Sequence, residues 1–510
     1  MKSLQLDRLW PEKASMKTVL LLMGLCLGLE TSAQSKTPDI MESVKQYPDS
    51  LSLHKLYIKG AGLSPEELTA QYEGLMKIFP ENATIPYALG ESLWNKELPE
   101  ARPFLLKAVE LDPKLAKAYF YLWIDAERWG DFKKGQEYLL KAREIDQDNP
   151  DYAFYYASSF SKSDSGKYTK LSLEVVNKFP DSERGAQSLY WLATRSKSDK
   201  DKLRYFSLLK DKFPPAKFSW SASGMSGYYD LLLKSDPDKS LELAKAMLDG
   251  SEEERDQKYW KGQIEVAQNI ISVNTLLDNN KPGEAYAVLE KTKMSRWSNA
   301  KNMVLLLKAK ALNASEKTDK AYEVLMTAYA KSPETEIGEA LHRYGTKLHK
   351  NKKTVENDIW AVRDAATEPA TDFSLKQYFK PGKASLADFR GKVILLTYWF
   401  PGCGPCRGEF PHFQNVVDKF KGKDLVYLGI NIVPEQNDYV IPFMKSSGYS
   451  FIPLEDYKER EKGNLDNRNA APMNFLIDKK GNVVFSDFRT DGDNEEVLEE
   501  MIASLLNRDE

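Results

Sequence analysis

A recurring spacing of prolines constrains most of this 510-residue chain. From residue 34 to residue 363 the sequence favours helix after helix, and successive prolines lie 32, 33, 37, 30 and 34 residues apart. Such a period is typical of helical hairpins that stack, because one hairpin cannot bury its apolar face alone. The spacing therefore predicts an all-α solenoid. The prolines are Pro48, Pro80, Pro113, Pro150, Pro180 and Pro214.

The clearest copy of the repeat, residues 116–147, resembles the tetratricopeptide pattern. Tyr119 lies on its first expected helix, Gly130 in the turn, and Gly135 and Ala142 on its second helix. Small residues at such positions let two helices approach closely. The resemblance implies a tetratricopeptide-like repeat domain.

Stacked repeats of this kind present an extended surface on which a protein segment can bind. Trp94, Trp129 and Tyr155 are candidate anchors for such a client, because aromatic side chains dominate many interfaces. The alternative is that they pack inside the repeats, which need large side chains to fill each layer. We find no catalytic constellation among these residues.

A different pattern begins with the apolar run 393–400, which is typical of a buried strand. It leads into Cys403-Gly404-Pro405-Cys406 and then into a polar helical segment. A thiol in the first turn of a helix meets unsatisfied N–H groups and the positive end of the helix dipole, so its pKa falls. We expect Cys403 to be a nucleophile and Cys406 the thiol that resolves its mixed disulfides.

Two other interpretations of the cysteine pair stay open. Structural zinc needs four ligands, and the remaining cysteine, Cys26, lies in an expected signal peptide. A purely structural disulfide is also possible, because C-x-x-C reactivity depends on its surroundings. Redox exchange is favoured, since a mature chain without other cysteines has no structural disulfides to maintain. No metal and no cofactor are expected.

From residue 372 to the C-terminus the sequence resembles the TlpA/ResA branch of the thioredoxin superfamily. The resemblance is carried by residues 385–392, by the CGPC motif, and by Arg407, Glu409 and Pro411 after it. It implies an α/β thioredoxin-like domain that exchanges disulfides with protein thiols. It also implies that Glu409 assists proton transfer at the buried thiol. The alternative for Glu409 is a solvated helix carboxylate.

The same resemblance places Ala471 and Pro472 opposite the dithiol. It implies a cis peptide bond before Pro472 and a backbone at Ala471 that pairs with a substrate strand. An ordinary trans proline opening a strand is the alternative. The chain departs from the family at Gly402, where relatives carry Trp before the first cysteine, and at Thr397, the position of a buried acid. These departures leave the reduction potential open.

The hydrophobic pattern predicts the strands and helices of the sheet domain and divides the whole chain into four segments. The sheet domain is expected to carry helices on both faces. Its expected strands are 392–400, 425–432, 473–477 and 482–486, and its expected helices are 403–420 and 495–506. The segments are 1–33 (extension and signal peptide), 34–363 (helical repeats), 364–371 (linker) and 372–510 (thioredoxin-like domain).

The N-terminus predicts export. An apolar run, 19–29, follows Met16-Lys17 and ends in small residues, so we expect cleavage after Ala33. The run is too short to span a bilayer. A periplasmic or cell-envelope location follows. Lipidation at Cys26 is disfavoured because the residue before it is the bulky Leu25.

These patterns favour an exported thiol-disulfide oxidoreductase whose repeats recruit protein clients. Its partners would be protein thiols or disulfides and an upstream redox protein. One alternative is a tetratricopeptide scaffold with a redox-inactive thioredoxin-like module. A thiol peroxidase is a weaker alternative, because the chain lacks the Thr-x-x pattern before its first cysteine. A net charge of −3 without a basic cluster argues against nucleic acid.

Overall fold

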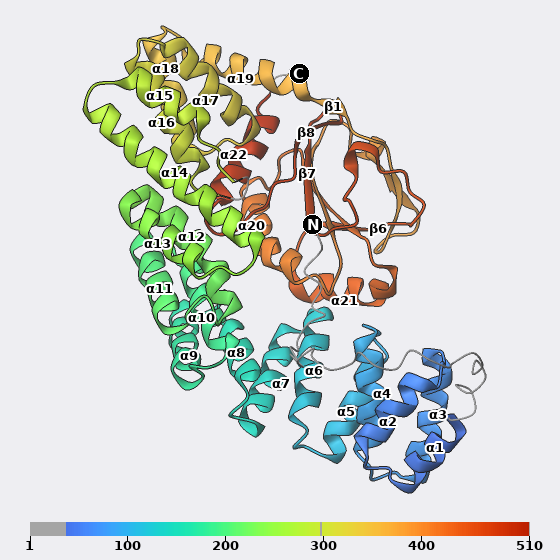
Figure 1. Ribbon diagram of the computed structural model, residues 1–510. Coiled ribbons are helices and arrows are strands. Elements are labelled where there is room, and N and C mark those ends of the chain that lie inside the picture. Colours follow the sequence, from blue (N-terminus) through green and yellow to red (C-terminus); the bar gives the residue numbers. More distant parts are fainter. Residues whose placement is uncertain (1–36, 296–297, 509–510) are drawn as a thin grey trace, which may run out of the picture.

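The computed structural model describes residues 37–295 and 298–508. The expected signal peptide and its cleavage site lie outside these residues. Helices between residues 37 and 366 form an arc, and a domain with a mixed sheet lies on its inner side (Figure 1). The expected fold class, a helical solenoid followed by an α/β thioredoxin-like domain, is confirmed. In the part of the chain described, no helix combines the length and apolar composition needed to cross a membrane.

Several helices of the arc begin where the sequence supplies a capping side chain or a proline. Ser64 and Glu67 form a capping box at the first turn of the third helix. Asp131 accepts the backbone N–H of Lys134 at the start of the seventh. Pro150, one of the periodic prolines, occupies the first turn of the eighth, where its missing N–H costs nothing. The helices are α1 (Thr37–Gln46), α2 (Leu51–Gly60), α3 (Pro65–Ile78), α4 (Thr84–Asn95), α5 (Ala101–Leu111), α6 (Ala116–Arg128), α7 (Phe132–Ile145), α8 (Pro150–Ser158), α9 (Ser165–Lys178), α10 (Glu183–Arg195), α11 (Asp199–Lys212), α12 (Ser219–Ser235), α13 (Pro237–Asp249), α14 (Glu254–Asp278), α15 (Pro282–Lys291), α16 (Lys301–Ala314), α17 (Thr318–Lys331), α18 (Thr335–Lys347) and α19 (Lys352–Ala366).

The aromatic residues proposed as client anchors have different surroundings. Trp94 stacks on Tyr121 inside the arc, with ring centroids 4.2 Å apart. Trp129 packs edge-on against Tyr439 of the sheet domain at 4.9 Å. Tyr155 is only partly buried, in a cluster of α6 and α8 side chains. All three rings are partly buried, and Trp129 is the one that packs on the sheet domain.

The sheet is organised around a strand that is buried along its whole length. All seven residues of Val393–Trp399 are buried, as a strand covered on both faces requires. This strand, β4, pairs in parallel with β5 (Leu425–Asn431) and antiparallel with β7 (Met473–Ile477). The order across the sheet is β1-β8-β7-β4-β5-β6-β2-β3. The other strands are β1 (Glu368–Pro369), β2 (Ser374–Gln377), β3 (Lys383–Ser385), β6 (Ile452–Glu455) and β8 (Asn482–Ser486).

The α-helices of this domain contribute to the apolar cluster on one face of the sheet. They are α20 (Gly404–Lys419), α21 (Asn437–Ser447) and α22 (Glu495–Leu506), and their buried side chains join Val393, Leu395 and Trp399 in one cluster. The apolar cluster on the other face of the sheet consists of residues from strands, loops and 3-10 turns. The expectation of helices on both faces is therefore wrong. The 3-10 turns of the domain are η1 (Leu386–Phe389), η2 (Pro434–Gln436) and η3 (Gly463–Leu465).

The turn between α6 and α7 packs directly on α21. Besides the contact of Trp129 with Tyr439, Phe132 meets Phe443 edge-on at 6.2 Å. Gly130, between them, has a φ of +77°, and a Cβ there would lie 2.9 Å from the Phe443 Cα. This close approach of two backbones requires glycine.

The expected linker, 364–371, takes part in the fold. Helix α19 continues to Ala366, and β1 pairs with β8. Asp364 forms an ion pair with Arg508 near the C-terminus at 2.7 Å. Trp360 of α19 packs against the same apolar cluster as the domain helices. The arc and the sheet domain are thus joined through packed side chains as well as through the chain.

The Gly130→Ala variant tests the contact between the α6–α7 turn and α21. A left-handed backbone costs a residue with a Cβ about 1–2 kcal/mol, and here the methyl group must also displace the Phe443 backbone. The matched control is Gly62→Ala, whose φ of +63° carries the same strain with no neighbouring atom within 4 Å. We expect Gly130→Ala to lower the thermal midpoint more and to speed limited proteolysis in α21. Equal losses in both variants would contradict the account.

Candidate functional site

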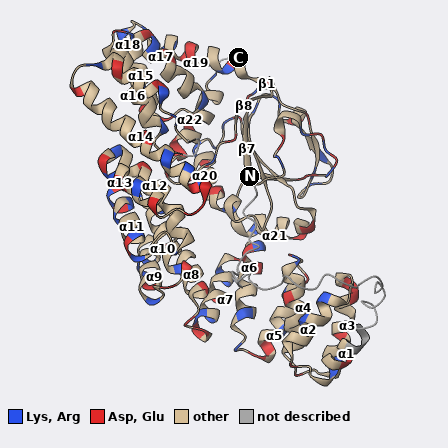
Figure 2. Ribbon diagram, viewed as in Figure 1, with Lys and Arg blue, Asp and Glu red and all other residues tan. Residues whose placement is uncertain are grey.

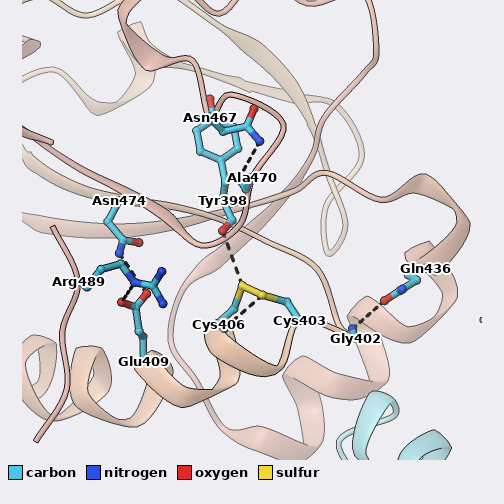
Figure 3. The surroundings of a disulfide bond; sticks show 10 residues. All are labelled: Tyr398, Gly402, Cys403, Cys406, Glu409, Gln436, Asn467, Ala470, Asn474 and Arg489. Carbon is cyan, nitrogen blue, oxygen red and sulfur yellow. Dashed lines mark hydrogen bonds and ion pairs between the residues drawn. A yellow bond between two sulfur atoms is a disulfide. The ribbon is translucent and has the colours of Figure 1, made fainter. Parts of the chain in front are cut away.

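The two cysteines lie at the start of α20, where the strand β4 ends (Figure 3). Cys403 is the N-cap residue, and its Sγ accepts the backbone N–H of Cys406 at 3.2 Å. The two are joined as a disulfide with Cα atoms 5.3 Å apart. Pro405 fits the first helical turn, as expected from its missing N–H. A negative charge on the Cys403 sulfur would therefore face a backbone donor and the positive end of the helix dipole.

The surroundings of the two sulfurs differ. Cys406 is fully buried beneath the helix start, and its Sγ lies 4.0 Å from the Tyr398 carbonyl oxygen. Cys403 is 2% exposed, but Gly404 and Pro405 beside it are exposed. The turn between the cysteines is therefore the part of the dithiol that faces solvent.

Glu409 lies three residues after Cys406, on the same face of α20. Its carboxylate accepts hydrogen bonds from Asn474 Nδ2 at 3.1 Å, the Thr490 backbone N–H at 3.1 Å, and Arg489 Nε. Burial raises the pKa of Glu409, against the opposing effects of Arg489 and the hydrogen bonds. Because Glu409 is only 4% exposed, a solvated surface carboxylate does not describe it.

The loop before β7 adjoins the dithiol. The Ala471–Pro472 peptide bond is cis, the isomer that the family resemblance implies. Ala471 packs against the apolar cluster that contains both cysteines, and Pro472 is buried. Asn467 Nδ2 donates to the Ala470 carbonyl oxygen at 2.9 Å and holds the loop. Ala470 itself is exposed.

The arc contacts the chain on both sides of the dithiol. Before Cys403, the Gly402 N–H donates to Gln436 Oε1 at 2.7 Å, and Gln436 Nε2 donates to Glu97 in the turn after α4. After Cys406, Arg407 Nη1 pairs with Glu127 of α6 at 3.1 Å. The helical arc is therefore part of the surroundings of the dithiol.

Sequence reasoning missed several residues of this site, among them Asn474, Arg489, Gln436 and Glu97. Only Asn474 carried a local signal, since it is the one polar residue of the apolar strand β7. The others are ordinary surface residue types, and their distant partners bring them into the site. In the described ranges, no group of three or more His, Cys, Asp or Glu side chains is arranged to hold a metal ion.

Comparisons with known proteins concern this C-terminal part. Residues 365–502 match the Redoxin family. The thiol-disulfide oxidoreductase ResA of Bacillus subtilis is 31% identical over 133 residues, which cover 26% of this chain and 73% of that protein. The ResA of Geobacillus kaustophilus is 32% identical over 123 residues, 24% of this chain and 68% of that protein.

A solved structure was also compared with the chain. The thiol:disulfide interchange protein DsbE of Chlorobium tepidum has 29% sequence identity and a TM-score of 0.24. The match covers 27% of this chain and 96% of that one.

The raised pKa of Glu409 predicts a pH dependence of stability. The folded state binds this proton more tightly than the unfolded state, so stability falls as pH rises from the ordinary value of 4.5 through the raised one. Glu409→Gln removes this titration. We expect the urea midpoint of the wild type, relative to this variant, to decrease as pH rises above 4.5.

Asp388→Asn is a control for which the opposite pH dependence of stability is expected. Hydrogen bonds from the Ser385 backbone and side chain lower the pKa of Asp388 below 3.8. The wild type should therefore gain stability relative to Asp388→Asn as pH rises through that lower window. A wild type that gains stability relative to Glu409→Gln with rising pH would contradict the burial argument.

Proposed function

The chain belongs, through its C-terminal domain, to the ResA-type thiol-disulfide oxidoreductases, and on that premise we propose that it is exported and exchanges disulfides with protein clients. The observation that carries the proposal is the cysteine pair at the N-terminus of α20, with the Cys403 sulfur facing the Cys406 N–H. This geometry favours a thiolate at Cys403.

When the chain acts as a reductant, the exchange proceeds in two steps. The Cys403 thiolate attacks one sulfur of a client disulfide, forms a mixed disulfide, and releases the other client sulfur as a thiolate that takes up a proton. The Cys406 thiolate then attacks the Cys403 sulfur, which closes the 403–406 disulfide and frees the second client thiol. Two electrons pass from the dithiol to the client. A second dithiol protein must return them before the next cycle.

Glu409 is proposed to serve the second step. Cys406 is buried and must lose its proton to attack, and Glu409 is the buried carboxylate one helical turn away. A carboxyl with a raised pKa is a better proton acceptor near neutral pH than one with an ordinary pKa. Arg489, Asn474 and Thr490 hold its oxygens in place.

The loop at Ala471 is proposed to receive the client backbone. Its neighbour Ala470 is exposed, and Ala471 lies against the cluster that contains both cysteines. An extended client segment that pairs with this backbone would bring its sulfur to the exposed turn at Gly404 and Pro405.

The arc is proposed to recruit the client. Phe120, Trp123 and Tyr155 form a partly exposed aromatic cluster, with Trp123 4.8 Å from Tyr155. The guanidinium of Arg184 lies 4.8 Å from the Tyr155 ring. Lys or Arg positions and Asp or Glu positions are interspersed along the helices (Figure 2), so aromatic contact suits recognition better than an electrostatic field of one sign. Holding a client here raises its effective concentration near the dithiol.

Cys406→Ser tests the proposal. The variant should accumulate mixed disulfides with proteins of the cell envelope, because the first step proceeds and the second cannot. Cys403→Ser, the matched control, should form none, and the wild type should reduce a generic protein disulfide. Absence of trapped protein while Cys403 remains reactive would contradict client exchange and favour a scaffold.

The same trapping experiment tests whether the helical arc contributes to client binding. Adding Trp123→Ala to the Cys406→Ser chain should reduce the amount of trapped client, while reduction of a small disulfide by a Trp123→Ala chain stays at the wild-type rate. Unchanged trapping would contradict recruitment by the aromatic cluster.

The proposal of export rests on the N-terminal sequence alone. A charged start, a short apolar run and small residues up to Ala33 are typical of a cleaved signal. N-terminal sequencing of the protein from the envelope fraction should give a chain that begins at Gln34. A full-length chain confined to the cytoplasm would contradict export.

A further inference from the structure

Gln436 connects the helical arc to the residue before the first cysteine. It is fully buried, in the 3-10 turn η2 that follows β5. Its Oε1 accepts the Gly402 N–H at 2.7 Å, and its Nε2 donates to Glu97 Oε2 at 2.5 Å. Both the oxygen and the nitrogen of the Gln436 amide therefore form a hydrogen bond. The oxygen binds Gly402 of the sheet domain, and the nitrogen binds Glu97 of the helical arc.

Glu97 is itself held on the arc side. It follows α4 in the chain, and its second carboxylate oxygen accepts a hydrogen bond from Arg128 Nη2 at 3.0 Å. The Arg128 side chain is 8% exposed and lies over the Trp94 ring at 5.5 Å. The hydrogen bonds thus run without a gap from a packed arginine of α6 to the backbone at Gly402.

Gly402 shows how closely this amide approaches the dithiol loop. A Cβ on Gly402 would lie 3.0 Å from Gln436 Oε1 and 3.1 Å from its Nε2, closer than ordinary van der Waals contact. In this chain the Gln436 amide occupies the space that any side chain at 402 would enter.

We propose that Glu97 of the helical arc, acting through Gln436, is a positioning residue for the Cys403 sulfur. The inference rests on the proposed thiol exchange and adds to it a residue from the repeat domain. The Gly402 N–H is bound to Gln436, and the Cys403 N–H donates to the Phe400 carbonyl oxygen at 2.9 Å. The backbone before the sulfur is fixed in this way, and the sulfur stays against the Cys406 N–H.

Losing the link would let the Cys403 backbone move away from that donor. The thiolate would then lose a hydrogen bond and part of the helix-dipole field, and its pKa would rise toward the reference value of about 8.5. Removing a carboxylate without moving the backbone has the opposite effect, because one negative charge fewer favours a thiolate. Loss of Glu97 therefore raises the Cys403 pKa if Glu97 positions the backbone, and lowers this pKa if Glu97 acts only through its negative charge.

The test measures the alkylation rate of Cys403 against pH in the reduced whole chain, with the modified peptide identified by mass spectrometry. Glu97→Ala and Gln436→Leu should each raise the inflection by about half a unit to one unit, the scale of one lost hydrogen bond to a thiolate. The inflection of the double variant should lie no higher than that of Gln436→Leu alone, because both residues act through the same chain of hydrogen bonds. Glu100→Ala is the matched control, since this exposed carboxylate has no hydrogen bond or ion pair among the described residues.

Three outcomes decide the proposal. Upward shifts in both single variants, with the wild-type profile in Glu100→Ala, support it. A downward shift or no shift in Glu97→Ala, or a wild-type profile in Gln436→Leu, overturns it. If Glu97→Ala is too unstable to measure, Glu97→Leu takes its place under the same criteria, because it also lacks the carboxylate and keeps a side chain of similar size. A wild type that reduces no protein disulfide would overturn the proposed function, while these alkylation profiles would still decide the positioning role.

Discussion

The backbone N–H of Cys406 points at the sulfur of Cys403, at the N-terminus of α20, and the proposed chemistry depends on this contact. An N-cap sulfur meets donors that the helix itself cannot satisfy. That placement requires β4 to end at Trp399 and the helix to begin at Gly404, so the buried strand and the helix start together fix the dithiol. The geometry favours a thiolate at Cys403, next to the exposed residues Gly404 and Pro405, and a protonated thiol at the fully buried Cys406.

The second constraint is the contact between the arc and the sheet domain. Gly130 lies against the backbone of α21, Trp360 packs against the apolar cluster of the sheet domain, and Glu127 pairs with Arg407 just after the dithiol. A client held on the arc would therefore be held at a fixed distance from the cysteines. A flexible tether would give only a range of distances.

The sequence predicts the parts of this structure that depend on local pattern. The apolar run at 393–400 becomes β4, and the amphipathic segment at 495–506 becomes α22 with the same bounds. The proline period predicts the arc, because each hairpin must repeat the same cap and turn. The cysteine pair lies at the expected helix start.

The parts that were missed depend on long-range contact. Strands β2, β3 and β6 have four residues or fewer, too short to show alternation. Helix α21 contains Pro442, which argues against a helix when only the local sequence is considered. Gln436 and Glu97 are 339 residues apart, and neither residue type suggests a buried role alone.

The most direct test of the account is the reactivity of the two thiols in the reduced wild-type protein. Peptide mapping after limited alkylation at graded pH separates Cys403 from Cys406. The account predicts that Cys403 is modified first, with an inflection well below about 8.5, and that Cys406 stays protected until the protein unfolds. Equal modification of both thiols, or an inflection of Cys403 at the reference value, would contradict it.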